Sequence, residues 1–224
     1  MAKDIRLQLR GQPRSRTAFP FHLLAEAPSE TIISLRRAAV QCRMAFRTPA
    51  SAMPNEISHL TLVLGGARSG KSCHAEALIE ALPAPWTYIA TAQAYDDEMR
   101  ERIAEHRARR PAGWQTVDAP LDLAGAIAAQ PAGRPILVDC LTLWLTNLIL
   151  AEHDTVAARE ALIAACERVS APLVLVGNEV GLGIVPENAL ARRFRDEAGR
   201  LHQALAARAA SVVFMVAGLP MRVK

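Results

Sequence analysis

Aromatic side chains are scarce in this 224-residue sequence, at 4% of the chain, whereas half of the residues are apolar and alanine is abundant. This composition favours helices packed on a sheet over an all-β fold. The chain is long enough for one α/β domain with a substantial core. Neither an internal repeat nor a second core is evident in the sequence, so we expect a single folded domain.

Cysteine is also sparse, and none of the four cysteines belongs to a C-x-x-C pair. This spacing argues against a metal cluster. It is typical of reduced thiols, so we expect a cytoplasmic protein. The residues concerned are Cys42, Cys73, Cys140 and Cys166.

An excess of positive charge is missing from most of the chain, although the whole sequence carries a net charge of +4. Residues 1–52 hold nine of the 26 Lys and Arg residues but only three of the 22 Asp and Glu residues, so residues 53–224 are slightly acidic. The larger part of the chain therefore gives no electrostatic reason to expect nucleic acid as a partner. Residues 1–58 contain no apolar run long enough for a secretory or membrane segment, and we expect no membrane span.

Residues 1–58 lack a clear hydrophobic period and contain five prolines, so we expect mostly disorder, with at most a short helix over 30–46. Three interpretations compete: a functional basic tail, a targeting segment, or upstream sequence read from a misassigned start codon. Met53 lies just ahead of the first predicted strand, which favours the third. We expect a disordered basic extension over 1–58 and a nucleotide-binding domain over 59–224.

One stretch of the chain carries a strand, a loop and a helix in the order that phosphate binding requires. Thr61–Leu64 is a short apolar run with the character of a buried strand. Residues 65–72 then read G-x-x-x-x-G-K-S, the phosphate-binding loop pattern. Apolar residues at helical spacing follow as far as Pro83, where the helix is expected to stop. A glycine-rich turn without a ligand is the weaker alternative.

The chemistry of that loop follows from its residue types. Glycines let the backbone turn with positive φ and lie close to an anion, and the N–H groups of the loop and of the helix start point at phosphate oxygens. Lys71 supplies a mobile positive charge, and Ser72 offers a hydroxyl to Mg²⁺. The predicted phosphate-binding residues are Gly65, Gly66, Ala67, Arg68, Ser69, Gly70, Lys71 and Ser72.

Strand and helix patterns alternate along the rest of the chain, which predicts a mostly parallel sheet flanked by helices on both faces. Right-handed crossovers then place the carboxyl ends of the strands at one edge of the sheet, where ligands bind. Strands are expected at 61–64, 86–90, 114–117, 135–139, 173–177 and 211–217, and helices at 71–82, 96–109, 121–130, 141–151, 155–169 and 188–210. The residues expected at that edge are Gly65, Thr91, Asp118, Asp139 and Asn178.

The roles of two polar segments at this edge, Asp139 and Asn178-Glu179, each have two interpretations. Asp139 closes an apolar strand, where such enzymes place the acid that holds Mg²⁺ or its water, although it could instead cap the helix that follows. Asn178-Glu179 precedes two glycines, and a polar role near the γ-phosphate or the acceptor is about as well supported as a simple turn.

A histidine surrounded by arginines is the third candidate. His106 lies in a predicted helix with Arg102 one turn before it and Arg109 and Arg110 about one turn after it. The arginines could bind a polyphosphate and lower the pKa of His106, which would keep its imidazole neutral and nucleophilic. On residue types alone, a solvated basic helix face is the better-supported interpretation.

These segments together resemble a known family. The stretches GGARSGKS-x-HAEAL, YIATAQ, DDEMRERIAEHRARRP, VDCLTLWLTN and NEVGLGIVPEN-x-LAR-x-FRDEAGR occur in unbroken order over about 60–224. They resemble the bifunctional adenosylcobinamide kinase/adenosylcobinamide-phosphate guanylyltransferase family. The phosphate loop alone is generic, whereas EHR-x-x-RP and NEVG-x-GIVPEN are specific to this family.

The resemblance implies two reactions at one P-loop NTPase (RecA-like) domain: phosphorylation of adenosylcobinamide by ATP or GTP, then transfer of GMP from GTP to the new phosphate. It implies a histidine–GMP intermediate at His106, a requirement for Mg²⁺ and a homotrimer. A P-loop small-molecule kinase without guanylyltransferase activity is the alternative. The nucleotide-binding positions that it implies beyond the loop are Thr91, Ala92, Gln93, Arg107, Ala108, Arg109, Arg110, Asp118 and Asp139, with Lys71 and His106 catalytic and Ser72 and Asp139 at the metal.

The chain departs from the family pattern in two places. Residues 1–58 lie outside the pattern, which supports a misassigned start codon. Positions 118 and 139 are Asp where some relatives have Glu, which leaves the reach of Asp118 to a ribose or a guanine open.

Overall fold

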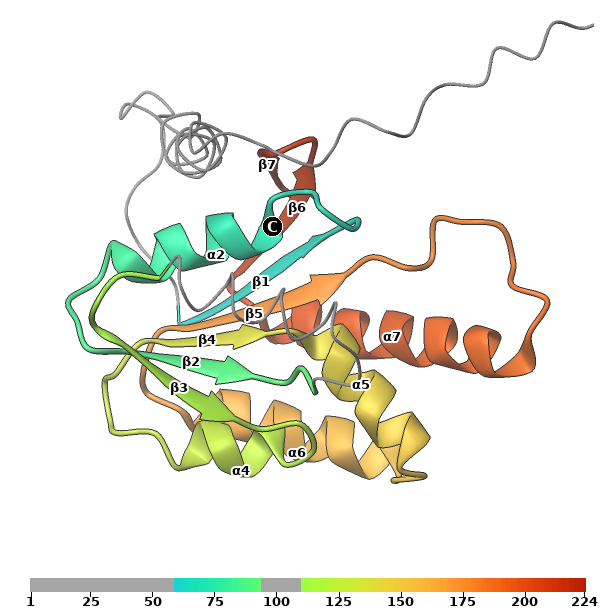
Figure 1. Cartoon of the computed structure of the whole chain (residues 1–224), viewed down its shortest axis with the longest axis horizontal. Helices are drawn as coiled ribbons and strands as arrows, with labels where there is room; N and C mark the ends of the chain where they lie inside the picture. The colour runs from blue at the N-terminus through green and yellow to red at the C-terminus, as the bar shows by residue number, and fades with distance from the viewer. Residues whose placement is uncertain (1–58, 94–109) are drawn as a thin grey trace, which may run out of the picture. The chain divides into compact units, whose positions relative to one another are not determined.

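A seven-stranded sheet organises residues 59–93 and 110–224, the residues that this computed structural model describes (Figure 1). The strand order is β3-β2-β4-β5-β1-β6-β7. Strands β1 to β6 all run parallel to one another, and β7 pairs with β6 in the antiparallel sense. The strands are β1 (Leu60–Gly65), β2 (Trp86–Ala90), β3 (Trp114–Asp118), β4 (Ile136–Asp139), β5 (Leu173–Asn178), β6 (Ser211–Val216) and β7 (Leu219–Arg222).

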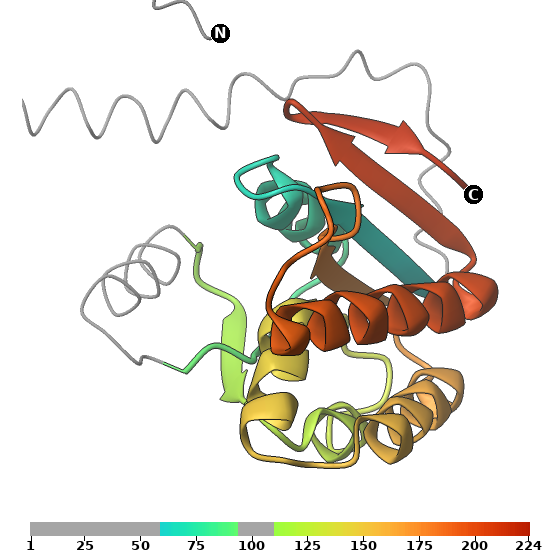
Figure 2. The ribbon, with the colours of Figure 1, turned by 90° about the vertical axis from the view of Figure 1, so that its right-hand side faces the viewer.

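Helices cover both faces of the sheet, as Figures 1 and 2 show. Helix α2 (Lys71–Glu80) packs against β1, β4 and β5 on one face. The other face carries α4 (Leu123–Ala128), α5 (Leu141–Leu150), α6 (Thr155–Arg168) and α7 (Ala189–Arg208). The predicted fold class, α/β with a mostly parallel sheet flanked by helices on both faces, is confirmed. The helix predicted over 96–109 and the disorder predicted over 1–58 lie outside the described residues.

The core is divided by the alternation of side chains along the buried strands. Leu62 and Val138 face the helices α4 to α7, together with the fully buried Ile127 of α4 and Leu162 of α6. Val63 belongs to the opposite layer, which packs under α2. Burial on both faces explains why these strands read as continuous apolar runs in the sequence.

The pairing register places the predicted site residues along one edge of the sheet. Gly65 pairs with Asn178 across β1 and β5, and Ala90 pairs with both Asp139 and Asp118. The strand order sets the spacing: Asp139 lies two strands from β1, and Asp118 lies four strands away. At about 4.8 Å per strand, Asp118 is about 19 Å from Gly65.

The hairpin at the end of the chain was not predicted. The chain turns at Ala217 and Gly218, both with positive φ, and returns as β7 at the edge of the sheet. Strand β7 contains Pro220, which an edge strand tolerates because one of its sides needs no ladder hydrogen bond. Figure 2 shows this hairpin in red at one edge of the sheet and β3 in green at the other.

Aspartate side chains cap the N-termini of two helices. Asp154 accepts hydrogen bonds from the N–H groups of Val156 and Ala157, so α6 begins at Thr155, as the sequence predicts. Asp122 accepts from Gly125 N and caps α4, which is shorter than the helix predicted over 121–130. Aspartate is among the residues that most often cap a helix in this way. None of the described helices combines the length and apolar character that crossing a bilayer requires.

Asn147 of α5 fastens the ends of two strands to the helix layer. Its buried Nδ2 donates to the backbone oxygens of Thr91, at 2.9 Å, and Pro120, at 3.0 Å. Those two carbonyls follow β2 and β3, the strands that carry the far side of the predicted site.

Replacing Asn147 by leucine keeps the number of side-chain heavy atoms but removes the donor, so the carbonyls of Thr91 and Pro120 lose a partner. We expect the free energy of unfolding to fall by about 2 kcal/mol or more, measured by urea denaturation. Gln203→Leu, on an exposed position of α7, is the control and is expected to change stability little. An Asn147→Leu variant as stable as the control would contradict the tethering role.

Candidate nucleotide-binding site

The loop between β1 and α2 has the backbone shape that the glycine pattern predicts. Gly70 has φ 93° and caps α2, a conformation that glycine adopts without strain. Gly65 has φ 150°, and a Cβ there would lie 2.7 Å from the backbone oxygen of Met215 and 2.8 Å from Ser69 Oγ. Only glycine therefore fits at position 65, and the loop can turn its N–H groups toward an anion.

Lys71 begins α2 and folds back over the loop. Its Nζ donates to the backbone oxygen of Gly66 at 2.6 Å, and the residue is only 7% exposed. Burial lowers the pKa of Lys71, while the neighbouring Cys140 and Asp139 act in the opposite direction. The effect of Asp139 on this pKa indicates that the carboxylate at the end of β4 lies within electrostatic reach of the lysine.

Asp139 is held by a tyrosine that the sequence analysis missed. Tyr88 donates its hydroxyl to Asp139 Oδ2 at 3.0 Å, and burial raises the pKa of Tyr88, which keeps the donor protonated. The guanidinium carbon of Arg110 lies 3.6 Å from the centre of the Tyr88 ring, a cation–π contact. We call Asp139, Tyr88 and Arg110 the acidic cluster. Helix α5 starts at Leu141, and its N-cap residue is Cys140 with no side-chain cap hydrogen bond, so the alternative that Asp139 caps this helix is wrong.

Thr91 joins the ends of β2 and β4. Its Oγ1 donates to the backbone oxygen of Cys140 at 2.7 Å and accepts from Cys140 N at 2.8 Å. The side chain is fully buried, so its hydroxyl serves the protein itself. Ala92 and Gln93 follow it, half-buried, at the carboxyl edge of the sheet, and nucleotide contacts from this segment stay a prediction.

The remaining predicted site residues fall into two groups. Asp118 is exposed at the end of β3, on the far side of the acidic cluster from the loop. His106, Arg107, Ala108 and Arg109 lie outside the described residues, and Arg110 is the first described residue after them. Their predicted roles are therefore not tested by the geometry.

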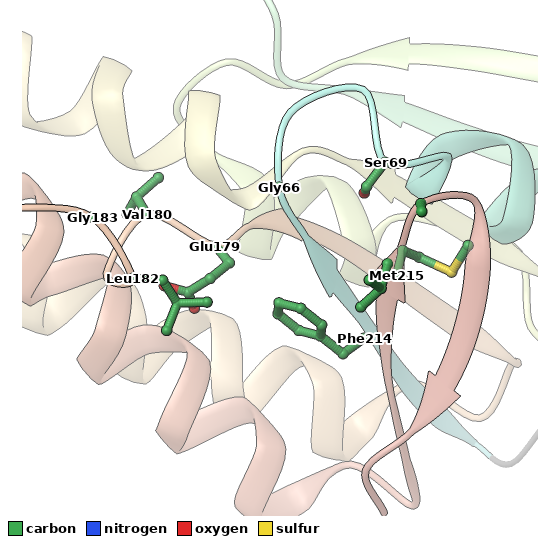
Figure 3. A pocket seen from close by; sticks show the side chains of 10 residues that line it. Gly66, Ser69, Glu179, Val180, Leu182, Gly183, Phe214 and Met215 are labelled. Atoms are coloured by element: carbon green, nitrogen blue, oxygen red, sulfur yellow. The ribbon is translucent and has the colours of Figure 1, made fainter.

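A second feature adjoins the loop on its other side. Glu179 N donates to Gly65 O at 3.0 Å, which ties the end of β5 to the start of the loop. Gly218 N donates to Ser69 O at 3.1 Å, which ties the β6–β7 hairpin to the same loop. Between these ties lies an open cavity of about 520 Å³ (Figure 3). We call it the hairpin pocket; it is lined by Gly66, Ser69, Glu179, Val180, Leu182, Gly183, Phe214, Met215, Val216 and Ala217.

Some of these features could have been found in the sequence and others could not. Glu179 was considered, because it follows a predicted strand and precedes glycines. Tyr88 stands inside the predicted strand 86–90, and nothing in the pattern separates its side chain from ordinary core. Phe214 and Met215 belong to a strand whose neighbour, β7, was not predicted. Nothing in the sequence therefore indicated that they line a pocket.

Comparison with known proteins agrees with this geometry. A family model described as cobinamide kinase/cobinamide phosphate guanyltransferase matches residues 61–223. The chain is 55% identical over 166 residues to the bifunctional adenosylcobalamin biosynthesis protein CobP of Pseudomonas aeruginosa, covering 73% of this chain and 96% of that protein. It is 48% identical over 181 residues to the bifunctional adenosylcobalamin biosynthesis protein CobU of Salmonella typhimurium, covering 74% and 99%. The Escherichia coli CobU is 46% identical over 181 residues, with the same coverage.

The three cysteines that the structure describes are expected to differ in reactivity. Cys73 is half-buried in the first turn of α2, whereas burial raises the pKa of Cys140 to about 11 and that of Cys166 to about 12. Because the thiolate is the reactive form, Cys140 and Cys166 should resist iodoacetamide below pH 10, and Cys73 should react first at pH 8. Peptide mass spectrometry measures the three sites separately, and a Cys73→Ser variant identifies the signal. Labelling of Cys140 as fast as that of Cys73 would contradict the burial described above.

Proposed function

Because this chain belongs to the cobinamide kinase/cobinamide phosphate guanyltransferase family, we propose that it phosphorylates adenosylcobinamide with ATP or GTP and then transfers GMP from GTP to the new phosphate. The product is adenosylcobinamide-GDP. The observation that carries the proposal is the gathering of the phosphate loop, Lys71 and the acidic cluster at one edge of the sheet. We also propose, on the resemblance alone, that the enzyme is a cytoplasmic homotrimer.

In the kinase step, the loop and Lys71 hold the triphosphate. The N–H groups of the loop bind phosphate oxygens, and the Lys71 ammonium offsets the negative charge of the transferring phosphoryl group. The position of Lys71 supports this role. Its ammonium already lies over the loop, against Gly66 O, and needs only a short movement to reach a phosphate bound there. The acceptor hydroxyl attacks the γ-phosphorus, the bond to the β-phosphate oxygen breaks, and the nucleoside diphosphate leaves.

The residues present suit Mg²⁺ as the metal. Ser72 and Asp139 offer a hydroxyl and a carboxylate, the oxygen ligands that Mg²⁺ prefers. Within the described ranges, no group of three or more His, Cys, Asp or Glu side chains could hold a metal ion without the substrate. A Mg²⁺ ion that binds with a nucleotide takes most of its ligands from phosphates and water. When bound, the ion would offset charge on the phosphate oxygens.

In the guanylyl transfer, we assign the nucleophile to His106. Its imidazole attacks the α-phosphorus of GTP, the bond to the β-phosphate oxygen breaks, and pyrophosphate leaves; the phosphate of the corrinoid then attacks the same phosphorus and the P–N bond breaks. The position of Arg110 supports this assignment. It lies four residues after His106 in the sequence and is held on Tyr88, beside Asp139, so the segment ends at the acidic cluster.

The first test is covalent labelling with GTP that carries ³²P at the α position. We expect an adduct that is labile in acid and stable in alkali, the behaviour of a P–N bond. His106→Ala should abolish the adduct and the guanylyl transfer while the kinase step continues, because phosphoryl transfer to the corrinoid does not pass through the imidazole. A wild-type protein with kinase activity and no adduct would leave the small-molecule kinase alternative. An adduct that survives His106→Ala would remove His106 from the mechanism.

The metal assignment predicts a graded response at Asp139. Asp139→Asn removes the charge that would hold Mg²⁺ or its water, so we expect the Mg²⁺ concentration for half-maximal kinase activity to rise about tenfold or more. Tyr88→Phe removes only the hydroxyl that donates to Asp139 Oδ2, and a smaller rise is expected. Activity titrated with Mg²⁺ for both variants measures this, and unchanged Mg²⁺ dependence in Asp139→Asn would place the metal elsewhere.

A further inference from the structure

The two sides of the phosphate loop differ in charge. On the side of β4 and β2 lies the acidic cluster, in which the carboxylate of Asp139 is accompanied by the guanidinium of Arg110. On the β6 side stands the hairpin pocket, whose ten lining residues include one carboxylate, Glu179, and no Lys, Arg or His. Its walls are apolar, formed mainly by Val180, Leu182 and Phe214. Beyond the loop residues Gly66 and Ser69, the pocket offers a polyphosphate no positive charge, whereas a neutral ligand with an apolar body suits it.

Glu179 is fixed where it can meet both the loop and the pocket. Its backbone N–H is bonded to Gly65 O at 3.0 Å, so its Cα stays beside the first loop residue. Its side chain is half-buried, accepts a hydrogen bond from Gly181 N and lines the pocket. Figure 3 shows the carboxylate beside Leu182, across the cavity from Phe214.

The loop that follows Glu179 carries apolar side chains that the protein itself leaves uncovered. Leu182 is 83% exposed, Ile184 97% and Val185 61%. Apolar groups gathered this way beside a pocket indicate a ligand surface rather than ordinary surface composition. The pocket, at about 520 Å³, can hold the arm of a larger molecule while these side chains support its apolar body.

We propose that the hairpin pocket receives the hydroxyl-bearing arm of the acceptor, and that the Glu179 carboxylate is the general base of the kinase step. This inference rests on the proposed function, in which the acceptor is an alcohol on an apolar macrocycle. The hydroxyl proton passes to the carboxylate as the hydroxyl oxygen bonds to the γ-phosphorus. The bond between the γ-phosphorus and the bridging oxygen breaks, and its electron pair leaves with the nucleoside diphosphate.

Removal of the base tests the chemical half of the proposal. Glu179→Gln keeps an oxygen that can accept from Gly181 N but cannot take a proton, so we expect kcat of the kinase step to fall about 100-fold, with the nucleotide KM unchanged. Guanylyl transfer to acceptor supplied already phosphorylated should continue at the wild-type rate. In Glu179→Ala, added formate should restore part of the lost kinase rate, because a small carboxylate can occupy the vacated space; Glu179→Gln should show no such rescue.

A change in the pocket wall tests the binding half. Leu182→Asp puts a charge where apolar contact is proposed, and since Leu182 is mostly exposed the fold should tolerate it. We expect the KM for the acceptor to rise about tenfold, in line with the loss of one buried leucine, with the nucleotide KM unchanged. The matched control is Leu150→Asp at the end of α5, where leucine is 59% exposed, and its acceptor KM should stay at the wild-type value.

The outcomes separate this inference from the proposed function. A wild-type protein without kinase activity would overturn the proposed function. If the wild type is active, wild-type kcat in Glu179→Gln overturns the base assignment, and a wild-type acceptor KM in Leu182→Asp overturns the pocket assignment. Thermal melting identifies a variant that fails to fold; if Glu179→Gln does, the formate rescue of Glu179→Ala decides the base assignment, and its absence overturns it.

Discussion

The contact of Gly65 with its neighbours is the constraint on which the rest of the site depends. Because Gly65 has no side chain, the loop can lie close to β6. A Cβ added at Gly65 would be 2.7 Å from the backbone oxygen of Met215. The Gly65 carbonyl accepts from Glu179 N. The same residue therefore sets the loop against β6, fixes the end of β5 and leaves the hairpin pocket between them. A methyl group at this point would displace these contacts, since the nearest atom is the backbone oxygen of Met215, which cannot turn away.

Tyr88 has a similar joining role on the opposite side of the loop. One face of its ring carries Arg110, its hydroxyl holds Asp139, and the Trp114 ring packs edge-on at 5.9 Å. The cation and the anion therefore both contact one rigid side chain, which places them at the same end of the sheet edge.

The sequence predicted the parts of this site that depend on local order. Glycine spacing gives the loop, and strand–helix alternation gives the parallel sheet, so Gly65, Asp139 and Asn178 could be placed at one edge. What could not be predicted depends on which strands become neighbours. The order β3-β2-β4-β5-β1-β6-β7 puts Asp118 four strands from the loop and brings Phe214 beside Glu179, and no periodicity encodes that order. Tyr88 was missed for a related reason, because its partners Asp139 and Arg110 are distant in sequence.

The unequal charge on the two sides of the loop also gives the two proposed reactions a direction. A neutral alcohol is compatible with the Glu179 carboxylate, but the phosphate monoester made from it is repelled by that same carboxylate. Arg110, on the other side of the loop, attracts the new phosphate instead. Phosphorylation thus changes the side of the loop at which the arm of the acceptor binds more favourably. The new phosphate is drawn toward Arg110, at the end of the segment to which the guanylyl transfer is assigned. A single nucleotide cradle can in this way serve two successive steps, because the charge of the acceptor changes between them.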